Sequence, residues 1–386
     1  MDRTFSFHLP PRIEFGEGML KRLPALVKET LKGSRVFVVT DPGVRKAGIV
    51  DPLLEDMRQA GFEIRVFDNV KPNPRDIDCE EGGLAIREFE AHMILAVGGG
   101  SVLDSAKAIA VLQANDAPLR QYEGRDRFPK DVVPIVAVPT TAGTGSEVTR
   151  SSVITDTGRK FKMTVKSVRL APRLAVVDPA TTHNLPKGLT ASTGMDAFVH
   201  AIESYTCKAS NPFSQAWAKE AMRYTFRNLK EAVLEGTRES RNIMMLGSVM
   251  AGVAFSHSDV AAVHCMAEAI GGLYDTPHGV ANSMFLPVVT EFNAQANPEV
   301  HAEVARICGL PVDVMPPREA AAFLVEELER LSEDVGIPEF GSQPGVSPDD
   351  FDRLAEASFI NGSTPSNCRT ISRADYLDLF RKAYRA

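Results

Sequence analysis

The chain has 386 residues, of which 44% are hydrophobic and 24% are charged, a composition typical of soluble globular proteins. At this length we expect two domains. The formal net charge of −7, with no run of Lys or Arg, argues against a nucleic-acid-binding surface. The chain start has no secretory-signal pattern and no apolar run reaches about eighteen residues, so we expect a cytoplasmic protein without a membrane segment. The five cysteines are scattered and form no Cys-x-x-Cys pair, which argues against a disulfide framework.

The first half of the chain alternates short apolar, β-branched runs with amphipathic stretches. The predicted strands are Val36–Thr40, Ile64–Phe67, Met93–Val97, Ile135–Val138 and Leu174–Val177. The predicted helices between them are Leu20–Leu31, Val50–Ala60, Asp76–Phe89 and Val102–Leu112. This alternation predicts βαβ units and a mostly parallel, Rossmann-like sheet that binds its ligand at the carboxyl ends of the strands. We assign residues 1–183 to an α/β dinucleotide-binding domain.

Two glycine-rich turns follow predicted strands, where such a sheet binds a ligand. In the first, Gly98–Gly100 and Ser101 lead into a helix, and the free backbone N–H groups there favour a phosphate. The second, Pro139–Glu147, alternates hydroxyl and small residues, which suits hydrogen bonds to a ribose or phosphate. Each turn alone is also typical of a plain loop, and the Gly-x-Gly-x-x-Gly fingerprint is absent. Together the two turns indicate one nucleotide.

Asp41 ends the predicted strand Val36–Thr40. A carboxylate at this position can accept hydrogen bonds from a ribose diol and repels a 2′-phosphate, which favours NAD over NADP. The segment Asp41-Pro42-Gly43 is equally typical of a simple turn, and both interpretations stay open.

The second half of the chain is predicted to be all helical, and we assign residues 184–386 to a second domain. Helical periodicity marks Phe213–Leu234, Ser240–Phe255, Val260–Leu273, Ala281–Ala294, Glu319–Val335 and Arg373–Tyr384, with a shorter helix at Asp349–Ala357. Such a domain would close over the nucleotide domain and form a cleft for the substrate.

Four residues of this half are candidate metal ligands. Asp196 and His200 are four apart in a helical segment and so share one helix face. His264 and His278 follow in the next helical segments. One carboxylate with three imidazoles suits Fe²⁺, Zn²⁺ or Ni²⁺ and suits Mg²⁺ or Ca²⁺ poorly. Any one of these histidines alone is more typical of a buried structural residue, but the four together favour a metal site.

Four long motifs, in this order along the chain, resemble those of the iron-containing (group III) alcohol dehydrogenases. They are Gly98–Lys107, Pro139–Thr149, Thr193–Glu203 and Gly271–Asn282. The resemblance implies a dehydroquinate-synthase-like architecture, NAD(P), a catalytic Fe²⁺ (alternatively Zn²⁺) and, commonly, a homodimer or higher homo-oligomer. By motif position it makes Asp196, His200, His264 and His278 the metal ligands. The cofactor contacts that it implies are Asp41, Gly99, Gly100, Ser101, Asp104, Thr140, Thr141, Thr144 and Lys162.

The chain departs from the family pattern at three ionisable positions. Glu268 stands where many members have a second histidine, four residues after the third ligand, and His257 and Asp259 lie in a normally less charged segment. We therefore name His257, Asp259 and Glu268 as candidate catalytic groups for an altered substrate or proton path. Solvent exposure or structural pairing would explain them equally well. Glu268, one turn from His264, is also a candidate extra ligand.

We expect a metal-dependent oxidoreductase that transfers a hydride between NAD(H) and a small primary alcohol or diol, or its aldehyde. The metal would act as a Lewis acid on the substrate oxygen. A reductase of a short acidic substrate, such as a semialdehyde or an oxo acid, is an alternative on the same scaffold. A dehydroquinate-synthase-like lyase is a further alternative, but it needs a basic cluster for a phosphorylated substrate, and none is seen near the ligands.

Overall fold

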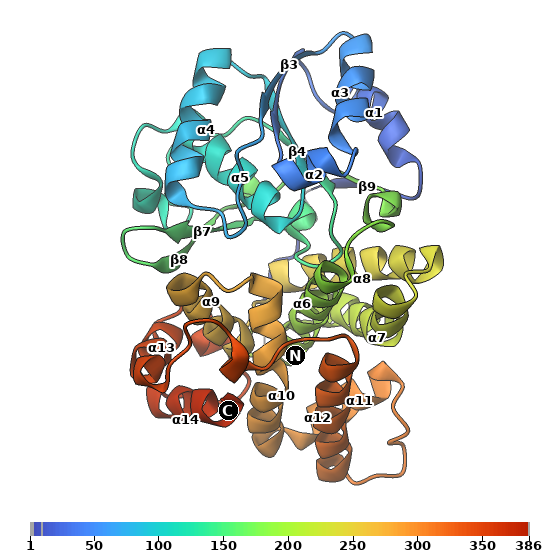
Figure 1. Cartoon of the computed structure of the whole chain (residues 1–386), viewed down its shortest axis with the longest axis vertical. Helices are drawn as coiled ribbons and strands as arrows, with labels where there is room; N and C mark the ends of the chain where they lie inside the picture. The colour runs from blue at the N-terminus through green and yellow to red at the C-terminus, as the bar shows by residue number, and fades with distance from the viewer. Residues whose placement is uncertain (1–3, 9–10, 385–386) are drawn as a thin grey trace. The chain divides into compact units, whose positions relative to one another are not determined.

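The computed structural model describes residues 4–8 and 11–384, which fall into two compact units. The α/β unit comprises residues 11–141 and 145–185. The helical unit comprises residues 4–8, 142–144 and 186–384. An α/β region with a parallel sheet followed by a mostly helical region confirms the predicted fold class (Figure 1).

The α/β unit is built on a six-stranded parallel sheet with the order β1-β9-β6-β4-β2-β3. Its strands are β1 (Arg12–Phe15), β2 (Arg35–Val39), β3 (Glu63–Phe67), β4 (Met93–Gly98), β6 (Ile135–Pro139) and β9 (Leu174–Val177). All five predicted strands are present. The sixth, β1, was not predicted because it is a short edge strand, mostly exposed, whose charged Arg12 and Glu14 interrupt the apolar pattern.

Helices cover both faces of this sheet. Alternate residues of β2 point to opposite faces, so Val36 and Val38 pack against α1 (Leu23–Thr30) and α3 (Val50–Gln59). Phe37 and Val39 pack against the other core, formed with α4 (Asp76–Phe89) and α5 (Gly100–Ala114). Burial on both faces explains why the central strands are almost continuously apolar.

A three-stranded sheet, β5-β8-β7, was not predicted. Its strands are β5 (Gly124–Arg125), β7 (Ser151–Asp156) and β8 (Phe161–Lys166), and β7 pairs with β8 in antiparallel fashion. The strand β7 is rich in Ser, Thr and Asp and buries only every second residue, so its apolar signal is weak. The five-residue helix α2 (Pro42–Lys46), directly after Asp41, was also missed.

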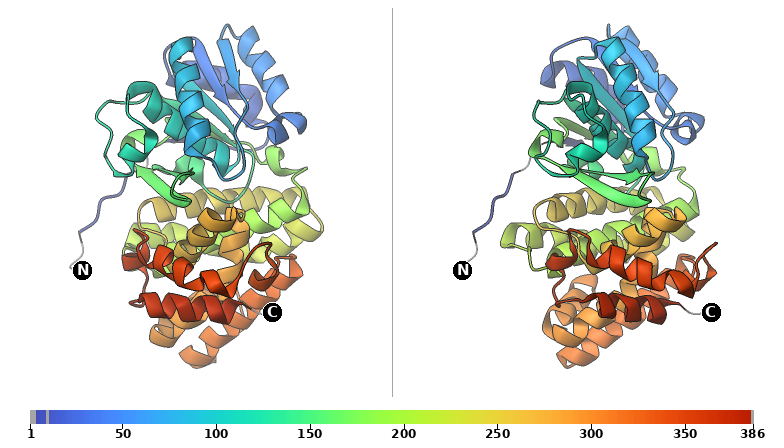
Figure 2. Two further views of the ribbon diagram at one scale, coloured as in Figure 1. Left: turned by 60° about the vertical axis from the view of Figure 1, so that its left-hand side comes forward. Right: turned by 90° about the vertical axis from the view of Figure 1, so that its left-hand side faces the viewer.

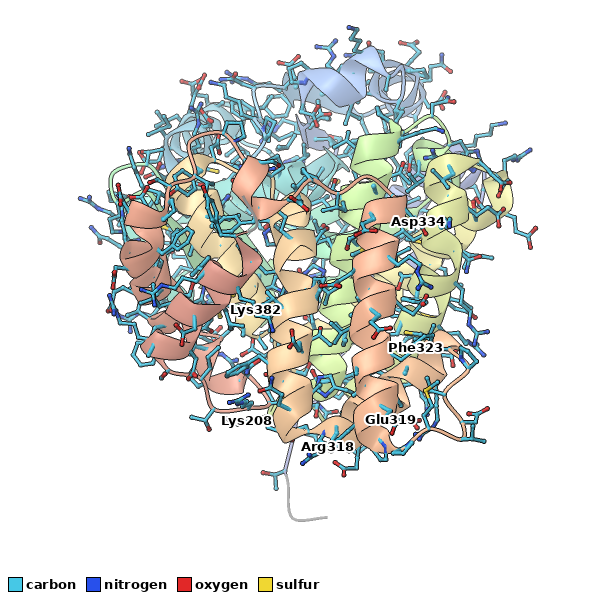
Figure 3. The ribbon with its side chains drawn as sticks, turned by 60° about the horizontal axis from the view of Figure 1, so that its bottom comes forward. Lys208, Arg318, Glu319, Phe323, Asp334 and Lys382 are labelled. Carbon is cyan, nitrogen blue, oxygen red and sulfur yellow. The ribbon has the colours of Figure 1, made fainter. Side chains whose placement is uncertain are left out.

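The helical unit contains α6 (Lys187–Thr206), α7 (Pro212–Leu234), α8 (Arg238–Ser256), α9 (Ala262–Tyr274), α10 (His278–Ala296), α11 (Pro298–Cys308), α12 (Pro317–Asp334), α13 (Phe351–Phe359) and α14 (Arg373–Ala383). Helices α6, α7 and α8 pack against one another (Figure 2). Helix α10 packs against α6, α9 and α12, and Figure 3 shows α12 with Glu319 near its start and Asp334 at its end. The short helix α11, which follows α10 after the single residue Asn297, was not predicted. Among the helices of the described residues, none has both the length and the apolar character needed to cross a membrane.

Candidate metal centre

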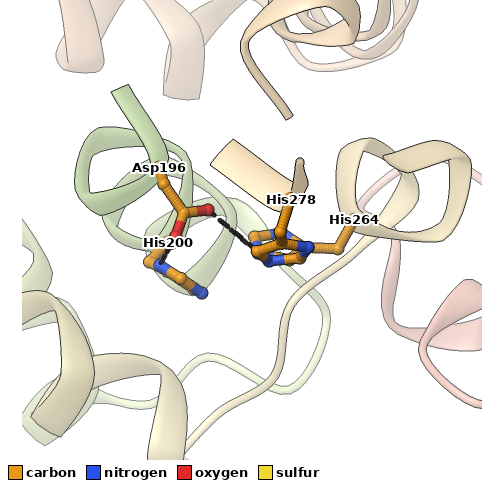
Figure 4. A group of neighbouring side chains, drawn as sticks. All are labelled: Asp196, His200, His264 and His278. Atoms are coloured by element: carbon orange, nitrogen blue, oxygen red, sulfur yellow. Dashed lines mark ion pairs between the residues drawn. The ribbon is translucent and has the colours of Figure 1, made fainter. Parts of the chain in front are cut away.

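The four predicted ligands come together in the helical unit (Figure 4). One ligand atom from each of Asp196, His200, His264 and His278 lies within 4.8 Å of all the others. Asp196 Oδ1 is 3.6 Å from His278 Nε2 and 3.9 Å from His264 Nε2, and Asp196 Oδ2 is 3.8 Å from His200 Nδ1. Three of the four side chains are buried, whereas that of His278 is 31% exposed.

Three helices supply these groups. Asp196 and His200 lie one turn apart in the interior of α6, His264 lies in the first turn of α9, and His278 begins α10. The close approach of α10 to α6 depends on Gly279, because a Cβ there would lie 2.4 Å from the backbone oxygen of Ser192. Only glycine therefore allows the start of α10 to place His278 against Asp196.

The donor set fits a divalent transition metal. His200 Nδ1 and His264 Nε2 are buried and have no hydrogen-bond partner among the described residues. A buried polar atom without a partner costs about 1–3 kcal/mol, and such atoms are rare in folded proteins. An ion bound at about 2.0–2.2 Å from N and O ligands would satisfy both nitrogens after a small side-chain movement. Three imidazoles and one carboxylate are the ligands of Fe²⁺ or Zn²⁺ rather than of Mg²⁺.

The environment shifts the pKa values of the two buried imidazoles in opposite directions. Burial lowers the pKa of His200 well below its ordinary value, and the neighbouring His264 lowers it further. Burial also acts to lower the pKa of His264, but the hydrogen bond and the charge of Glu203 outweigh it, and the net shift is upward. His264 Nδ1 donates to Glu203 Oε2 at 2.6 Å, so Nε2 is the nitrogen that faces the cluster.

Two residues next to the cluster were missed by the sequence analysis. Glu203 lies on α6 and contacts His264. Asn282, fully buried and one turn after His278, places its Nδ2 at 2.6 Å from Asp196 Oδ1 and 3.1 Å from His278 Nε2. Their spacing could have indicated both residues, because each lies three or four positions after a candidate ligand, on the same helix face.

The three candidate catalytic groups all lie in the helical unit but have different surroundings. His257 is buried, with Nδ1 at 2.8 Å from the Val253 oxygen and Nε2 against the backbone oxygen of His8. Asp259 accepts hydrogen bonds from the hydroxyls of Ser363 (3.1 Å) and Ser366 (2.6 Å).

The partly exposed Glu268 accepts a hydrogen bond from Asn361 Nδ2 at 2.6 Å. It is not one of the four clustered ligand groups, which argues against its interpretation as an extra ligand. Its charge nevertheless acts on His264, four residues before it on α9.

The candidate nucleotide turns lie at one edge of the sheet in the α/β unit. Strands β2, β4 and β6 are neighbours, so Asp41, Gly99 and Thr140 all follow adjacent carboxyl ends. Gly99 is the N-cap of α5, and Gly100 and Ser101 form its first turn. The Thr140 N–H donates to the Gly98 oxygen at 3.1 Å and joins the two turns. A Cβ on Gly99 would lie 3.2 Å from the Thr141 side chain.

The remaining candidate cofactor residues already have protein contacts. Asp41 Oδ1 accepts from the Val44 N–H at 2.9 Å and caps α2, as the turn interpretation predicts. The carboxylate of Asp104 accepts from Ser146 Oγ at 2.6 Å and from the Val153 N–H at 3.0 Å, so it holds the second turn. Lys162 Nζ donates to Asn73 Oδ1 at 2.8 Å. Thr144 belongs to the helical unit.

A buried lysine on α5 contacts the second turn and the residues that follow it. Lys107 on α5 is 1% exposed, and its Nζ donates to Ser146 Oγ (2.7 Å), Thr149 Oγ1 (3.0 Å) and the Ser151 oxygen (2.8 Å). Burial lowers the pKa of Lys107. Beside it, burial raises the pKa of the fully enclosed Glu147 to about 7. The family motifs contain both residues, but the sequence alone did not show that they share one buried cluster.

Comparison with known proteins places both units in one family. Residues 10–179 match the model described as iron-containing alcohol dehydrogenase, and residues 190–384 match that of the C-terminal region of the Fe-containing alcohol dehydrogenase family. The chain is 40% identical to 1,3-propanediol dehydrogenase of Klebsiella pneumoniae over 92% of this chain and 93% of that protein. It is 35% identical to lactaldehyde reductase of Escherichia coli (strain K12), over 96% and 97% of the two chains. The solved structure of a 1,3-propanediol oxidoreductase, 39% identical, superposes with a TM-score of 0.94 over 99% of this chain and 100% of that chain. The chain belongs to the iron-containing alcohol dehydrogenase family.

Proposed function

We propose that this protein transfers a hydride between NAD(H) and a small primary alcohol or diol, or the corresponding aldehyde, with the help of one bound Fe²⁺ or Zn²⁺. The observation that carries the proposal is the cluster of one carboxylate and three imidazoles, in which two buried ring nitrogens have no partner among the described residues. The relatives named for propanediol and lactaldehyde act on short, oxygen-rich substrates, which supports the same class here.

Each side chain of the cluster has a role in this reaction. Asp196, His200, His264 and His278 would hold the ion, and Asn282 would fix the Asp196 carboxylate by its hydrogen bond. When bound, the metal supplies Lewis-acid stabilisation of the charge that develops on the substrate oxygen. Because only His278 is substantially exposed among the four, we infer that the substrate oxygen approaches from the His278 side.

Glu268 is the most suitable of the three candidate catalytic groups to contact the substrate. His257 and Asp259 are engaged by backbone carbonyls and by serine hydroxyls, respectively, which favours structural roles for both. Glu268 is partly exposed and lies on the same face of α9 as His264. Its carboxylate can accept a hydrogen bond from a second hydroxyl of the substrate and repels a substrate carboxylate. We therefore favour a diol over a short acidic substrate.

We propose NAD rather than NADP as the cofactor. Gly99, Gly100 and Ser101 would bind the pyrophosphate at the start of α5, with Thr140 and Thr141 beside them. With Oδ1 of Asp41 capping α2, its Oδ2 is left to accept from a ribose hydroxyl and to repel a 2′-phosphate. We also propose a cytoplasmic homodimer, which light scattering of the purified protein and fractionation of the cells would test.

The test is metal content and NADH-linked turnover in the same samples. We expect anaerobically purified wild type to contain about one equivalent of Fe or Zn. It should reduce 3-hydroxypropionaldehyde with NADH, whereas Asp196→Ala and His264→Ala should lose both properties. His183→Gln, in the α/β unit, is the control and should keep both. A wild type that turns over without metal would refute the proposal.

The role of Glu268 is tested separately with Glu268→Gln, which removes the charge but keeps the shape. We expect kcat/KM for an acidic aldehyde such as succinic semialdehyde to rise about tenfold relative to that for 3-hydroxypropionaldehyde, which corresponds to about 1.4 kcal/mol. An unchanged ratio would show that Glu268 does not face the substrate.

A further inference from the structure

A buried carboxylate on α6 joins the helices that carry the candidate ligands. Glu203 is 4% exposed and accepts three hydrogen bonds, all from the start of α9. Its Oε2 accepts from the Ala261 N–H at 2.8 Å and from His264 Nδ1 at 2.6 Å, and its Oε1 accepts from the Val263 N–H at 2.7 Å. No side chain of α9 itself accepts a hydrogen bond from these N–H groups, because the N-cap residue Ala261 has no side-chain acceptor.

Two of these bonds cap α9 from a neighbouring helix. The first N–H groups of a helix have no partner inside it, and a negative charge beside them is favoured by the helix dipole. Glu203 satisfies two such groups, so it holds the first turn of α9 against α6. His264 belongs to that same turn, and its position is therefore set by this carboxylate.

The third bond selects the proton position on His264. A carboxylate can only accept, so the nitrogen facing Glu203 must carry a hydrogen, and a neutral imidazole then has its lone pair on the other nitrogen. That nitrogen, Nε2, is buried, has no hydrogen-bond partner among the described residues, and lies 3.9 Å from Asp196 Oδ1. The hydrogen bond thus orients the ring and exposes the ligating lone pair to the cluster.

We propose that Glu203 is a positioning residue that fixes the tautomer and the orientation of His264 and thereby sets the affinity for the metal. Helix α6 would then supply two ligands, Asp196 and His200, and, one turn after His200, the group that holds the third. This inference rests on the proposed metal-dependent function, but it concerns a residue that does not itself touch the ion.

The test is the isosteric variant Glu203→Gln. A carboxamide has only one acceptor oxygen, so its NH₂ group must face either the Val263 N–H, at the Oε1 position, or both the Ala261 N–H and His264 Nδ1, at the Oε2 position. Facing His264, it would move the ring proton to Nε2 and block ligation. We expect the affinity for Zn²⁺ or Co²⁺, measured by competition with a chromogenic chelator, to fall about 10–100-fold. The visible spectrum of bound Co²⁺ should change as well.

A capping control separates affinity from stability. Asp375 caps α14 through the Ser372 N–H, outside the cluster, so Asp375→Asn should lower stability without changing metal affinity. Glu203→Asp keeps the charge and should recover part of the affinity that Glu203→Gln loses. A folded Glu203→Gln protein with wild-type metal affinity would overturn the proposal and leave Glu203 as a helix cap only.

A second measurement uses the wild-type protein, and the His264→Ala variant serves only to assign the His264 signals. In metal-free protein labelled with ¹⁵N-histidine, we expect His264 at pH 8 to be the neutral tautomer protonated at Nδ1. A tautomer protonated at Nε2 would overturn the proposal even if the variants fail to fold. If wild type binds no divalent metal, the proposed function fails, whereas the tautomer result still decides the role of Glu203.

Discussion

Asp196 Oδ1 and His278 Nε2 lie 3.6 Å apart although the two residues belong to different helices. A cation between them would cross-link α6 and α10, so its binding should stabilise the folded protein. At a free metal concentration about 100-fold above Kd, the stabilisation is about 2.7 kcal/mol. We expect dialysis against a chelator to lower Tm by about 5–10 °C and readdition of metal to restore it. His278→Ala should show a much smaller shift, measured by differential scanning fluorimetry under anaerobic conditions.

Asn282→Ala removes the amide that donates to Asp196. We expect about tenfold weaker metal binding, because the Asp196 carboxylate loses the group that orients it. Asn293→Ala is the matched control, since Asn293 is a buried amide on the same helix that pairs with Asn367. Equal metal affinities in the two variants would show that Asn282 has no role at the cluster.

Lys107→Met removes the donor to Ser146, Thr149 and Ser151 and leaves Asp104 as the contact from α5 to the second glycine-rich turn. We expect the free energy of unfolding to fall by about 3–5 kcal/mol, as when one partner of a buried ionic network is removed. We also expect KM for NADH to rise about tenfold with unchanged metal content. Lys130→Met, at an exposed lysine, should change neither quantity. An unaltered KM for NADH in a folded Lys107→Met protein would show that Lys107 does not contribute to cofactor binding.

The burial of Glu147 predicts a pH dependence of stability. Burial raises the pKa of this carboxyl from an ordinary value of 4.5 to about 7. The native state therefore keeps a proton that the unfolded chain loses, and stability falls as pH rises between these values. Glu147→Gln removes the ionisable group, so its stability relative to wild type should increase from pH 4.5 to pH 8 by about 2–3 kcal/mol. Urea unfolding at both pH values measures this difference in the free energy of unfolding. A difference between variant and wild type that is the same at both pH values would contradict the prediction.

The sequence was sufficient for features with a local cause. The buried central strands were visible as apolar runs, and the amphipathic helices as a 3.6-residue period, because both patterns come from short-range geometry. The pair Asp196 and His200 was visible for the same reason. By contrast, the edge strand β1 and the polar strand β7 lack a strong local pattern and were missed. The short helix α11 was missed although its buried residues follow a helical period.

Contacts between distant segments were decided by the tertiary structure alone. Glu203 contacts the start of α9, Asn282 contacts Asp196, and Lys107 contacts oxygens of Ser146, Thr149 and Ser151, each across a wide gap in sequence. The contacts of His257 with the Val253 and His8 oxygens were equally invisible in the sequence. The sequence indicated which residues are candidates for binding a metal and a nucleotide, because side-chain chemistry and local periodicity follow directly from it. Only the packing of the helices decided which of their atoms face one another, because those distances depend on the whole fold.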